Sequence, residues 1–265
     1  MLIEEKVGSG QIFWKSIDKN GKIWFQHQFQ LPFALIDQEK PAIKLLKQLF
    51  QEALLQNPDC LSFDKEYQVT TQLEFPRLWG LGSSSTMIYN LSQWLNVDPY
   101  RLLNKTMGGS GYDLACAGND KPLIYQLVDN KPIVESINFY PQFTDQLYFV
   151  YLNQKQKSQK EVRRYKKQKK DIQKVIPIIN EITDLIIKSQ NISDFNLLLH
   201  EHEKVMSSVL NRPVIQEQFS DFDGQLKSLG AWGGDFILAS GGSDTVNYFN
   251  TKGFKTVISY KEMIK

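Results

Sequence analysis

The sequence predicts an α+β protein built from two halves, with a boundary near residue 140. The chain has 265 residues, of which 42% are hydrophobic and 12% aromatic, enough for a substantial core in one large domain or two smaller ones. Strand-like and helix-like patterns occur in both halves. The pattern changes after Pro141, where longer helical segments begin. These observations favour two α+β units of similar size.

The first half alternates short strands with amphipathic helices. Asn20-Gly21 marks a hairpin turn, and Pro41 begins a helix whose apolar pairs recur every four residues. Asp98 and Pro99 have the residue types of an N-cap and a first helical position. A buried helical stripe is expected from Met87 to Leu95. The expected strands are 11–17, 22–29, 67–75, 122–127 and 132–139. The helix that Asp98 would cap is short and covers 98–106.

The second half is expected to begin with a strand and to continue with two long helices. A strand–turn–strand unit, a short helix and a last strand complete it. The ranges are 146–152, 159–189, 193–210, 225–240, 243–251 and 254–259, in that order.

Composition and charge exclude several classes of protein. The net charge is +2, so the whole molecule has no strong field to attract nucleic acid or a membrane surface. Cys60 and Cys116 are the only cysteines, which cannot form a disulfide framework and which fit a reducing compartment. The sequence has no apolar run that could span a bilayer, and its first residues lack the pattern of a signal peptide. We therefore expect a cytoplasmic protein.

A glycine- and serine-rich loop precedes the helix expected near residue 87. It reads "GLGSSST" over residues 80–86. Glycines let the backbone of a helix N-terminus approach an anion closely, and hydroxyls add hydrogen bonds or a ligand for Mg²⁺. The loop lacks the Gly-Lys-Ser/Thr of a P-loop, the third glycine of a dinucleotide motif and the second glycine of a nucleophile elbow. A serine-rich helix cap is the alternative interpretation of this stretch.

Two further glycine-rich segments follow. In "GGSGYD" (108–113), Asp113 comes at the exit of a flexible loop and could hold a metal or accept a proton; the alternative is a cap for the next helix. "GAWGGDF" (230–236) lies between two expected strands, where glycines indicate a close backbone approach or a simple hairpin turn.

Taken together, the three segments resemble the GHMP kinases, a family that includes galactokinase, homoserine kinase, mevalonate kinase and phosphomevalonate kinase. "GLGSSST" is similar to the family's second signature, the loop that wraps the ATP phosphates. "GSGYD" resembles the segment that carries the family's active-site aspartate, and "KSLGAWGGDF" (227–236) resembles its third signature. The order and approximate spacing of the segments match, and the resemblance covers nearly the whole chain.

The resemblance implies a two-domain α+β GHMP kinase fold. Residues 1–140 would form the ATP-binding domain, similar to ribosomal protein S5 domain 2, and residues 141–265 a ferredoxin-like domain. The implied activity is transfer of a phosphoryl group from Mg²⁺-ATP to a small molecule. A mevalonate-pathway acceptor is the first choice, because "GSGYD" and the Gly-Gly-Asp of the third segment are closest to that branch. The oligomeric state stays open, a homodimer included.

The resemblance also assigns roles to individual residues. Asp113 would orient or deprotonate the acceptor, and Ser84 would be the ligand for Mg²⁺ and act with Asp113 in catalysis. The residues expected to bind ATP are Gly80, Leu81, Gly82, Ser83, Ser84 and Ser85. Those expected on the substrate side are Ser110, Gly111, Gly230, Ala231, Gly233, Lys155 and Lys157.

The chain departs from the family in three places. No segment matches the first signature, and "MLIEEK" resembles the strand that follows it, so we expect an incomplete N-terminal domain. Trp232 replaces a glycine of the third signature, and the segment before Asp113 lacks the metal-binding glutamate of mevalonate kinases. A non-catalytic protein with this fold, which binds a nucleotide or a partner, is therefore the alternative function.

Other polar features are better explained without a site. The basic run 155–170 could bind nucleic acid, but a solvated helical face is the favoured interpretation. His200 and His202 are two residues apart on a helix and face different directions, whereas zinc ligands on a helix need to share one face.

Overall fold

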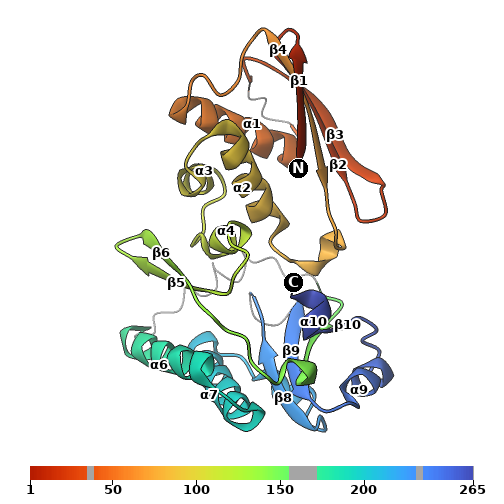
Figure 1. Cartoon of the computed structure of the whole chain (residues 1–265), viewed down its shortest axis with the longest axis vertical. Coiled ribbons are helices and arrows are strands. Elements are labelled where there is room, and N and C mark those ends of the chain that lie inside the picture. The colour runs from red at the N-terminus through yellow and green to blue at the C-terminus, as the bar shows by residue number, and fades with distance from the viewer. Residues whose placement is uncertain (35–38, 155–171, 231–234, 265) are drawn as a thin grey trace. The chain divides into compact units, whose positions relative to one another are not determined.

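A computed structural model of the chain describes residues 1–34, 39–154, 172–230 and 235–264 (Figure 1). The chain divides into two compact units. Unit 1 contains Met1–Arg77 and Leu81–Asn138, and unit 2 contains Leu78–Gly80 and Phe139–Lys265. The chain thus contributes three residues to unit 2 before it completes unit 1.

Unit 1 is built on a four-stranded sheet with the order β1-β4-β2-β3. The strands are β1 (Leu2–Val7), β2 (Gln11–Ile17), β3 (Ile23–Gln30) and β4 (Lys65–Gln72). β2 and β4 are parallel, and the other two pairs are antiparallel. At the β2–β3 turn, the carboxylate of Asp18 accepts hydrogen bonds of 2.9 Å from the backbone N–H groups of Asn20 and Lys22. The expected Asn-Gly hairpin is thus confirmed, because Gly21 has the positive φ that such a turn requires (+81°).

Four helices and a hairpin complete unit 1. They are α1 (Pro41–Gln56), α2 (Ser83–Leu95), α3 (Pro99–Thr106), α4 (Tyr112–Ala117) and the antiparallel pair β5 (Leu123–Val128) and β6 (Lys131–Ser136). Helices α1, α2 and α3 lie together beside the sheet (Figure 1). Alternate residues of β2, Ile12 and Trp14, are buried in the same core as Phe50 of α1 and Leu91 of α2.

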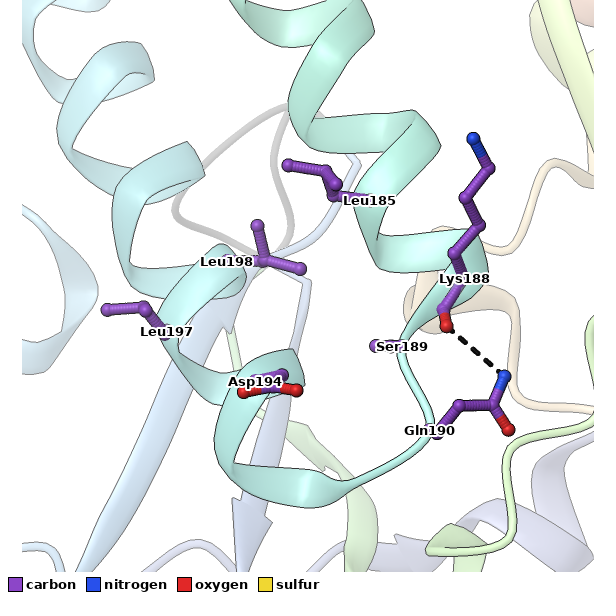
Figure 2. A pocket seen from close by; sticks show the side chains of 7 residues that line it. All are labelled: Leu185, Lys188, Ser189, Gln190, Asp194, Leu197 and Leu198. Carbon is purple, nitrogen blue, oxygen red and sulfur yellow. Dashed lines mark hydrogen bonds between the residues drawn. The ribbon is translucent and has the colours of Figure 1, made fainter.

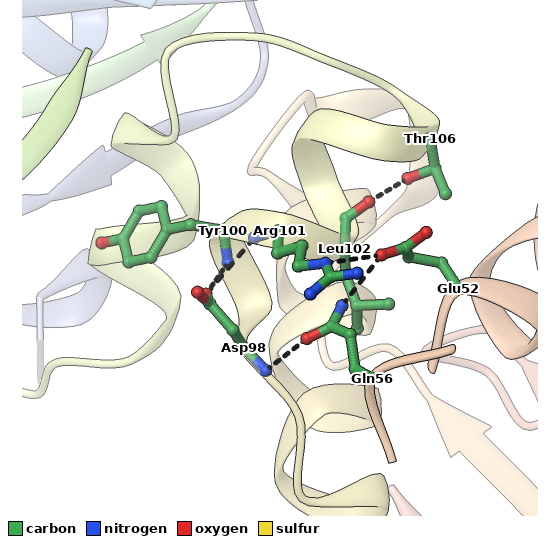
Figure 3. A network of polar contacts seen from close by, with 7 residues as sticks. All are labelled: Glu52, Gln56, Asp98, Tyr100, Arg101, Leu102 and Thr106. Carbon is green, nitrogen blue, oxygen red and sulfur yellow. Dashed lines mark hydrogen bonds and ion pairs between the residues drawn. The ribbon is translucent and has the colours of Figure 1, made fainter. Parts of the chain in front are cut away.

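A polar network joins α1 to α3 at the edge of this core (Figure 3). The Arg101 Nε donates to Glu52 Oε1 at 2.9 Å, and the backbone N–H of Asp98 donates to Gln56 Oε1 at 3.0 Å. The Asp98 carboxylate accepts from the backbone N–H groups of Tyr100 and Arg101, as expected for the N-cap of α3. The network fixes the position of α3, and α3 leads directly to the segment that contains Asp113.

Unit 2 contains a second four-stranded sheet, fully antiparallel, with the order β10-β7-β9-β8. Its strands are β7 (Leu147–Tyr151), β8 (Gly224–Ser228), β9 (Phe236–Gly241) and β10 (Val257–Ser259). Its helices are α6 (Val175–Lys188), α7 (Ile192–Leu210), α8 (Ile215–Gln218), α9 (Thr245–Thr251) and α10 (Tyr260–Met263). Three single-turn 3₁₀ helices lie at Arg77–Trp79, Thr144–Gln146 and Ile172–Lys174.

A buried charged pair connects α7 to the end of β8. Glu203 is 1% exposed, and its carboxylate accepts hydrogen bonds from the backbone N–H of Ser228 (3.0 Å) and from the hydroxyl of Ser228 (3.2 Å). The ammonium group of Lys227 lies 3.5 Å from Glu203 Oε1. Burial lowers the pKa of Lys227, and Glu203 opposes this shift. Glu203 therefore holds the last residues of an edge strand immediately before the third glycine-rich segment.

Most expected elements are present, with differences at their ends. The strand expected at 67–75 is β4, which begins at Lys65 and ends at Gln72, and the last strand is shorter than 254–259. Of the long helix expected at 159–189, α6 covers the second half, and residues 159–171 lie outside the described residues. Helices α8 and α10 are not in the sequence prediction, because four residues are too few to show a helical period.

Within the described ranges, none of the helices combines the length and the apolar character needed to cross a membrane.

Candidate functional site

The N-terminal end of α2 has the geometry of an anion site. Gly82 precedes the helix with φ +67°, in the left-handed region that glycine adopts without strain, and no side chain caps the helix there. The first intrahelical bond runs from the backbone N–H of Thr86 to the carbonyl of Gly82 (3.0 Å). The amides of Ser83, Ser84 and Ser85 precede this bond and have no acceptor within the helix. Three donors at the positive end of a helix dipole favour a bound anion.

Asp113 lies directly beside this helix end. It is in the first turn of α4, behind Gly111, which also has a positive φ (+85°). A methyl group placed on Gly82 would lie 3.8 Å from the Cβ of Asp113. The fold of unit 1 thus brings Asp113 of the second glycine-rich segment to the start of the serine-rich helix.

The surroundings of Asp113 favour its neutral form. Its side chain is accessible, but neighbouring groups displace part of its water, and this desolvation raises the pKa of the carboxyl above its ordinary value. A carboxylate with a raised pKa is a stronger base, which suits the transfer of a proton from a hydroxyl group.

Two tyrosines hold the backbone that leads to Asp113. The hydroxyl of Tyr125 on β5 donates to the carbonyl of Ser110. Gly111 is buried, and a methyl group on it would come within 2.9 Å of Tyr100 Cε1 and 3.0 Å of the Tyr125 hydroxyl. Any other residue at 111 would displace these rings and move the first turn of α4. Ser110 and Gly111 therefore set the position of Asp113.

The first glycine of the loop has a different environment. Gly80 belongs to unit 2 and has φ +69°. A methyl group placed on it would lie 2.3 Å from Oδ2 and 2.5 Å from Cγ of Asp235, far inside van der Waals contact. The carboxyl group of Asp235 therefore lies against the backbone of Gly80.

Comparison with solved structures supports this arrangement of elements. A mevalonate kinase from Methanococcus jannaschii aligns with 94% of this chain and 83% of its own, with 17% identity and a TM-score of 0.61. A galactokinase from Lactococcus lactis, complexed with galactose, aligns with 97% of this chain and 84% of its own, at 12% identity and a TM-score of 0.64. A Lin0012 protein from Listeria innocua aligns with 96% and 88%, at 14% identity and a TM-score of 0.67. The chain has the α+β, two-domain GHMP kinase fold.

Because the sequence identities to these three structures are only 12–17%, the similarity shows the GHMP kinase fold and nothing finer. No protein-family model and no curated protein sequence matches the chain. The three glycine-rich segments of this GHMP fold are therefore interpreted from their own geometry.

A nucleotide with Mg²⁺ fits the residues at the start of α2. Free amides and serine hydroxyls suit phosphate oxygens, and Ser84 is exposed. The described part of the chain contains no group of three or more His, Cys, Asp or Glu side chains able to enclose a metal ion. Mg²⁺ commonly keeps most of its ligands from water and phosphate, so a hydroxyl and one carboxylate are sufficient protein groups.

Several predicted substrate residues cannot be placed. Ala231, Gly233, Lys155 and Lys157 lie outside the described residues, and so does the whole basic run 155–170. Gly230 is described and has φ +57°, with open space where a side chain would begin.

A pocket of about 340 Å³ lies at the turn between α6 and α7 (Figure 2). Leu185, Leu197 and Leu198 line it together with Lys188, Ser189, Gln190 and Asp194, and Gln190 Nε2 donates to the Lys188 carbonyl at 3.2 Å. None of the predicted site residues within the described ranges lines this pocket.

Sequence reasoning gave no role to Asp235, Tyr151 or Glu203. Asp235 ends the Gly-Gly-Asp stretch, so its position was a usable signal. Tyr151 and Glu203 lie in an ordinary strand and an ordinary helix, and only the tertiary structure shows what they contact.

Proposed function

We propose that the chain is an ATP-dependent small-molecule kinase of the GHMP type. One observation carries this proposal: Asp113, whose side chain is accessible, lies at the uncapped N-terminus of α2, with its Cβ 3.8 Å from where a methyl group on Gly82 would lie. The pairing places a base next to a set of phosphate donors, and a phosphoryl transfer to a hydroxyl group needs both.

The proposed roles follow from the chemistry of each group. The amides of Ser83, Ser84 and Ser85 bind and orient the phosphate chain, and Gly82 lets the backbone approach it. Asp113 orients the acceptor hydroxyl and takes its proton. Ser84 offers its hydroxyl to Mg²⁺. When bound, Mg²⁺-ATP supplies the phosphoryl group and neutralises the charge that develops during transfer.

The acceptor is proposed to be a small alcohol of the mevalonate-pathway type. "GSGYD" and the Gly-Gly-Asp of residues 233–235 favour this class, and mevalonate kinases are among the similar structures. Galactokinase and a heptose phosphate kinase are also among them, so sugars are the competing acceptors. On this proposal residues 1–140 bind ATP, residues 141–265 form the second domain, and the enzyme works in the cytoplasm with Cys60 and Cys116 as free thiols.

A panel of acceptors tests the proposal. The chain is incubated with γ-labelled ATP, Mg²⁺ and either mevalonate, phosphomevalonate, galactose or a heptose phosphate, and labelled products are separated. Transfer to one of them supports the kinase. Binding of ATP without transfer to any acceptor would support the non-catalytic, nucleotide-binding alternative. A chain that binds no nucleotide would contradict the kinase and leave the partner-binding form of the alternative.

A further inference from the structure

Unit 2 holds the entrance of the phosphate loop through three neighbouring contacts. The hydroxyl of Tyr151, the last residue of β7, donates to the carbonyl of Leu78 at 3.1 Å. The ring of Trp79 meets Phe236 edge-on, with centroids 5.4 Å apart, and lies 6.3 Å from the ring of Tyr151. Asp235 covers the backbone of Gly80. Each residue of Leu78–Gly80 thus has its own partner in unit 2, either on β7, on β9 or directly before β9.

The partners themselves are fixed by that sheet. Tyr151 is paired with Phe236 across the β7–β9 ladder, and the two rings are 5.2 Å apart. The backbone N–H of Leu152 donates to the carbonyl of Asp235 at 2.9 Å. Phe236 is 4% exposed, so this corner of unit 2 is closely packed. Burial and the negative charge of Asp235 raise the pKa of Tyr151, which keeps its hydroxyl protonated and able to donate.

The two glycines of the loop are therefore required for different reasons. Gly80 and Gly82 have nearly the same φ, +69° and +67°, so a side chain at either position carries a similar backbone strain. Only Gly80 has a neighbour within 3.0 Å of the position that a side chain would occupy. The additional restriction at Gly80 comes from Asp235 alone among the atoms nearest to it.

We infer that Tyr151 and Asp235 are positioning residues for the phosphate loop. They set the place and direction of Leu78–Gly80, the stretch that contains the first glycine of the loop. The inference rests on the proposed nucleotide site at that helix end. Neither residue is assigned a contact with the substrate; both act through the backbone of the loop.

A double-mutant comparison tests this inference. The affinity for a non-hydrolysable ATP analogue with Mg²⁺ is measured for the full chain and for the single variants Gly80→Ala, Gly82→Ala and Asp235→Ala. It is also measured for two double variants, which combine Asp235→Ala with Gly80→Ala or with Gly82→Ala. Gly82→Ala is expected to weaken binding about 10-fold through backbone strain alone. Gly80→Ala should weaken it more than Gly82→Ala does, because the carboxyl group of Asp235 must also move aside. Asp235→Ala should restore Gly80→Ala to about the level of Gly82→Ala, roughly 10-fold, and should not improve Gly82→Ala.

Asp235 makes further interactions, so Asp235→Ala can change the affinity for the ATP analogue by itself. The affinity of each double variant is therefore compared with that of Asp235→Ala. Tyr151→Phe supplies a second measurement that removes one hydrogen bond and little volume; we expect a 3- to 10-fold loss of affinity, on the order of one such bond. Tyr148→Phe is the matched control, since Tyr148 is on the same strand and, among the described residues, makes no hydrogen bond or ring contact with Leu78–Gly80. The thermal midpoint of every variant is recorded to verify folding.

The outcomes separate the inference from the proposed function. If the wild-type chain binds the analogue, but Tyr151→Phe binds equally well and Asp235→Ala rescues both glycine variants alike or neither, the inference is wrong and the kinase proposal stands. If the wild-type chain binds no nucleotide, both are wrong. Selective rescue of Gly80→Ala together with a weakened Tyr151→Phe supports the inference.

Discussion

Asp113 and Gly82 come from separate glycine-rich segments and meet at the N-terminus of α2, where a methyl group on Gly82 would lie 3.8 Å from the Cβ of Asp113. The contact joins α4 to the loop before α2, and it depends on two glycines with positive φ, Gly82 and Gly111. Desolvation raises the pKa of the Asp113 carboxyl, so the charged form of this side chain lowers the stability of the fold. Such an arrangement is typical of a functional residue rather than a stabilising one.

This conflict predicts a stability effect at Asp113. Because its folded-state pKa is raised above the unfolded value of about 3.9, ionisation disfavours the folded state, and stability is lost as pH rises through the folded-state pKa. Asp113→Asn should therefore raise the thermal midpoint at pH 7 by on the order of 1–3 °C. The difference from wild type should disappear near pH 3, where both side chains are neutral. A variant that is less stable at pH 7 would contradict the assignment.

Ser84 should contribute to the use of Mg²⁺. Its hydroxyl is exposed at the first turn of α2, whereas the hydroxyl of Thr86 donates to the carbonyl of Gly82 at 3.3 Å. We expect Ser84→Ala to raise the Mg²⁺ concentration for half-maximal activity roughly 5- to 10-fold, the worth of one ligand or charge-assisted bond. Thr86→Ala, which removes a hydroxyl from the same turn, should leave the Mg²⁺ dependence unchanged. Equal shifts for both variants would argue for a general effect on the helix end.

The buried pair Glu203–Lys227 should behave as a unit. Glu203→Gln leaves the buried ammonium group of Lys227 without its counter-charge, and we expect a loss of about 3–5 kcal/mol in the free energy of unfolding. Lys227→Met should lose less, because Ser228 still donates two hydrogen bonds to Glu203. Urea denaturation of the double variant should give a loss smaller than the sum of the two single losses, by at least ~1 kcal/mol. Additive losses would show that the pair does not interact.

His202 should make the protein sensitive to acid. Burial and the positive charge of Lys227 lower its pKa to about 4, and its buried Nδ1 has no hydrogen-bond partner among the described residues. Since the folded-state pKa is below the unfolded value of about 6.5, the stabilisation is present above pH 6.5 and is lost as pH falls towards 4. We expect a loss on the order of 1–2 kcal/mol over this range, after allowing for solvent screening.

The control for His202 is on the same helix. His202→Leu should flatten the fall in stability between pH 6.5 and 4, and His200→Leu should preserve it. If His202→Leu follows the wild-type curve, another group causes the acid sensitivity.

The fold could be predicted well from local patterns, for identifiable reasons. Pro41, the Asn20-Gly21 turn and the Asp98 cap have chemistry that specifies one local structure, and each is present where it was expected. The apolar stripe of α2 is equally clear, since Ile88, Leu91 and Leu95 are all buried. The end of β4 was misplaced because the alternation of apolar residues continues to Phe75 after the hydrogen-bonded ladder has ended at Gln72.

The candidate site was only partly predictable. The glycine-rich segments identified the loop and Asp113 through local sequence. The contact of Tyr151 with Leu78, and that of Glu203 with Ser228, join residues far apart in the chain, and neither has a local signature. Gly80 and Gly82 are indistinguishable in the sequence, although among the described residues a carboxyl group lies within 3.0 Å of the side-chain position at Gly80 and not at Gly82. Such differences arise from packing and require the three-dimensional structure.

The most direct test of the kinase proposal compares two readouts in Asp113→Asn, a substitution that preserves the shape of the side chain and removes its capacity as a base. With the acceptor identified from the panel, the rate of phosphoryl transfer should fall about 10³-fold, as expected for the loss of a general base. The affinity for the ATP analogue should stay within about 3-fold of wild type, since the amides of Ser83–Ser85 are unchanged. Transfer that continues at close to the wild-type rate would contradict the central role given to Asp113.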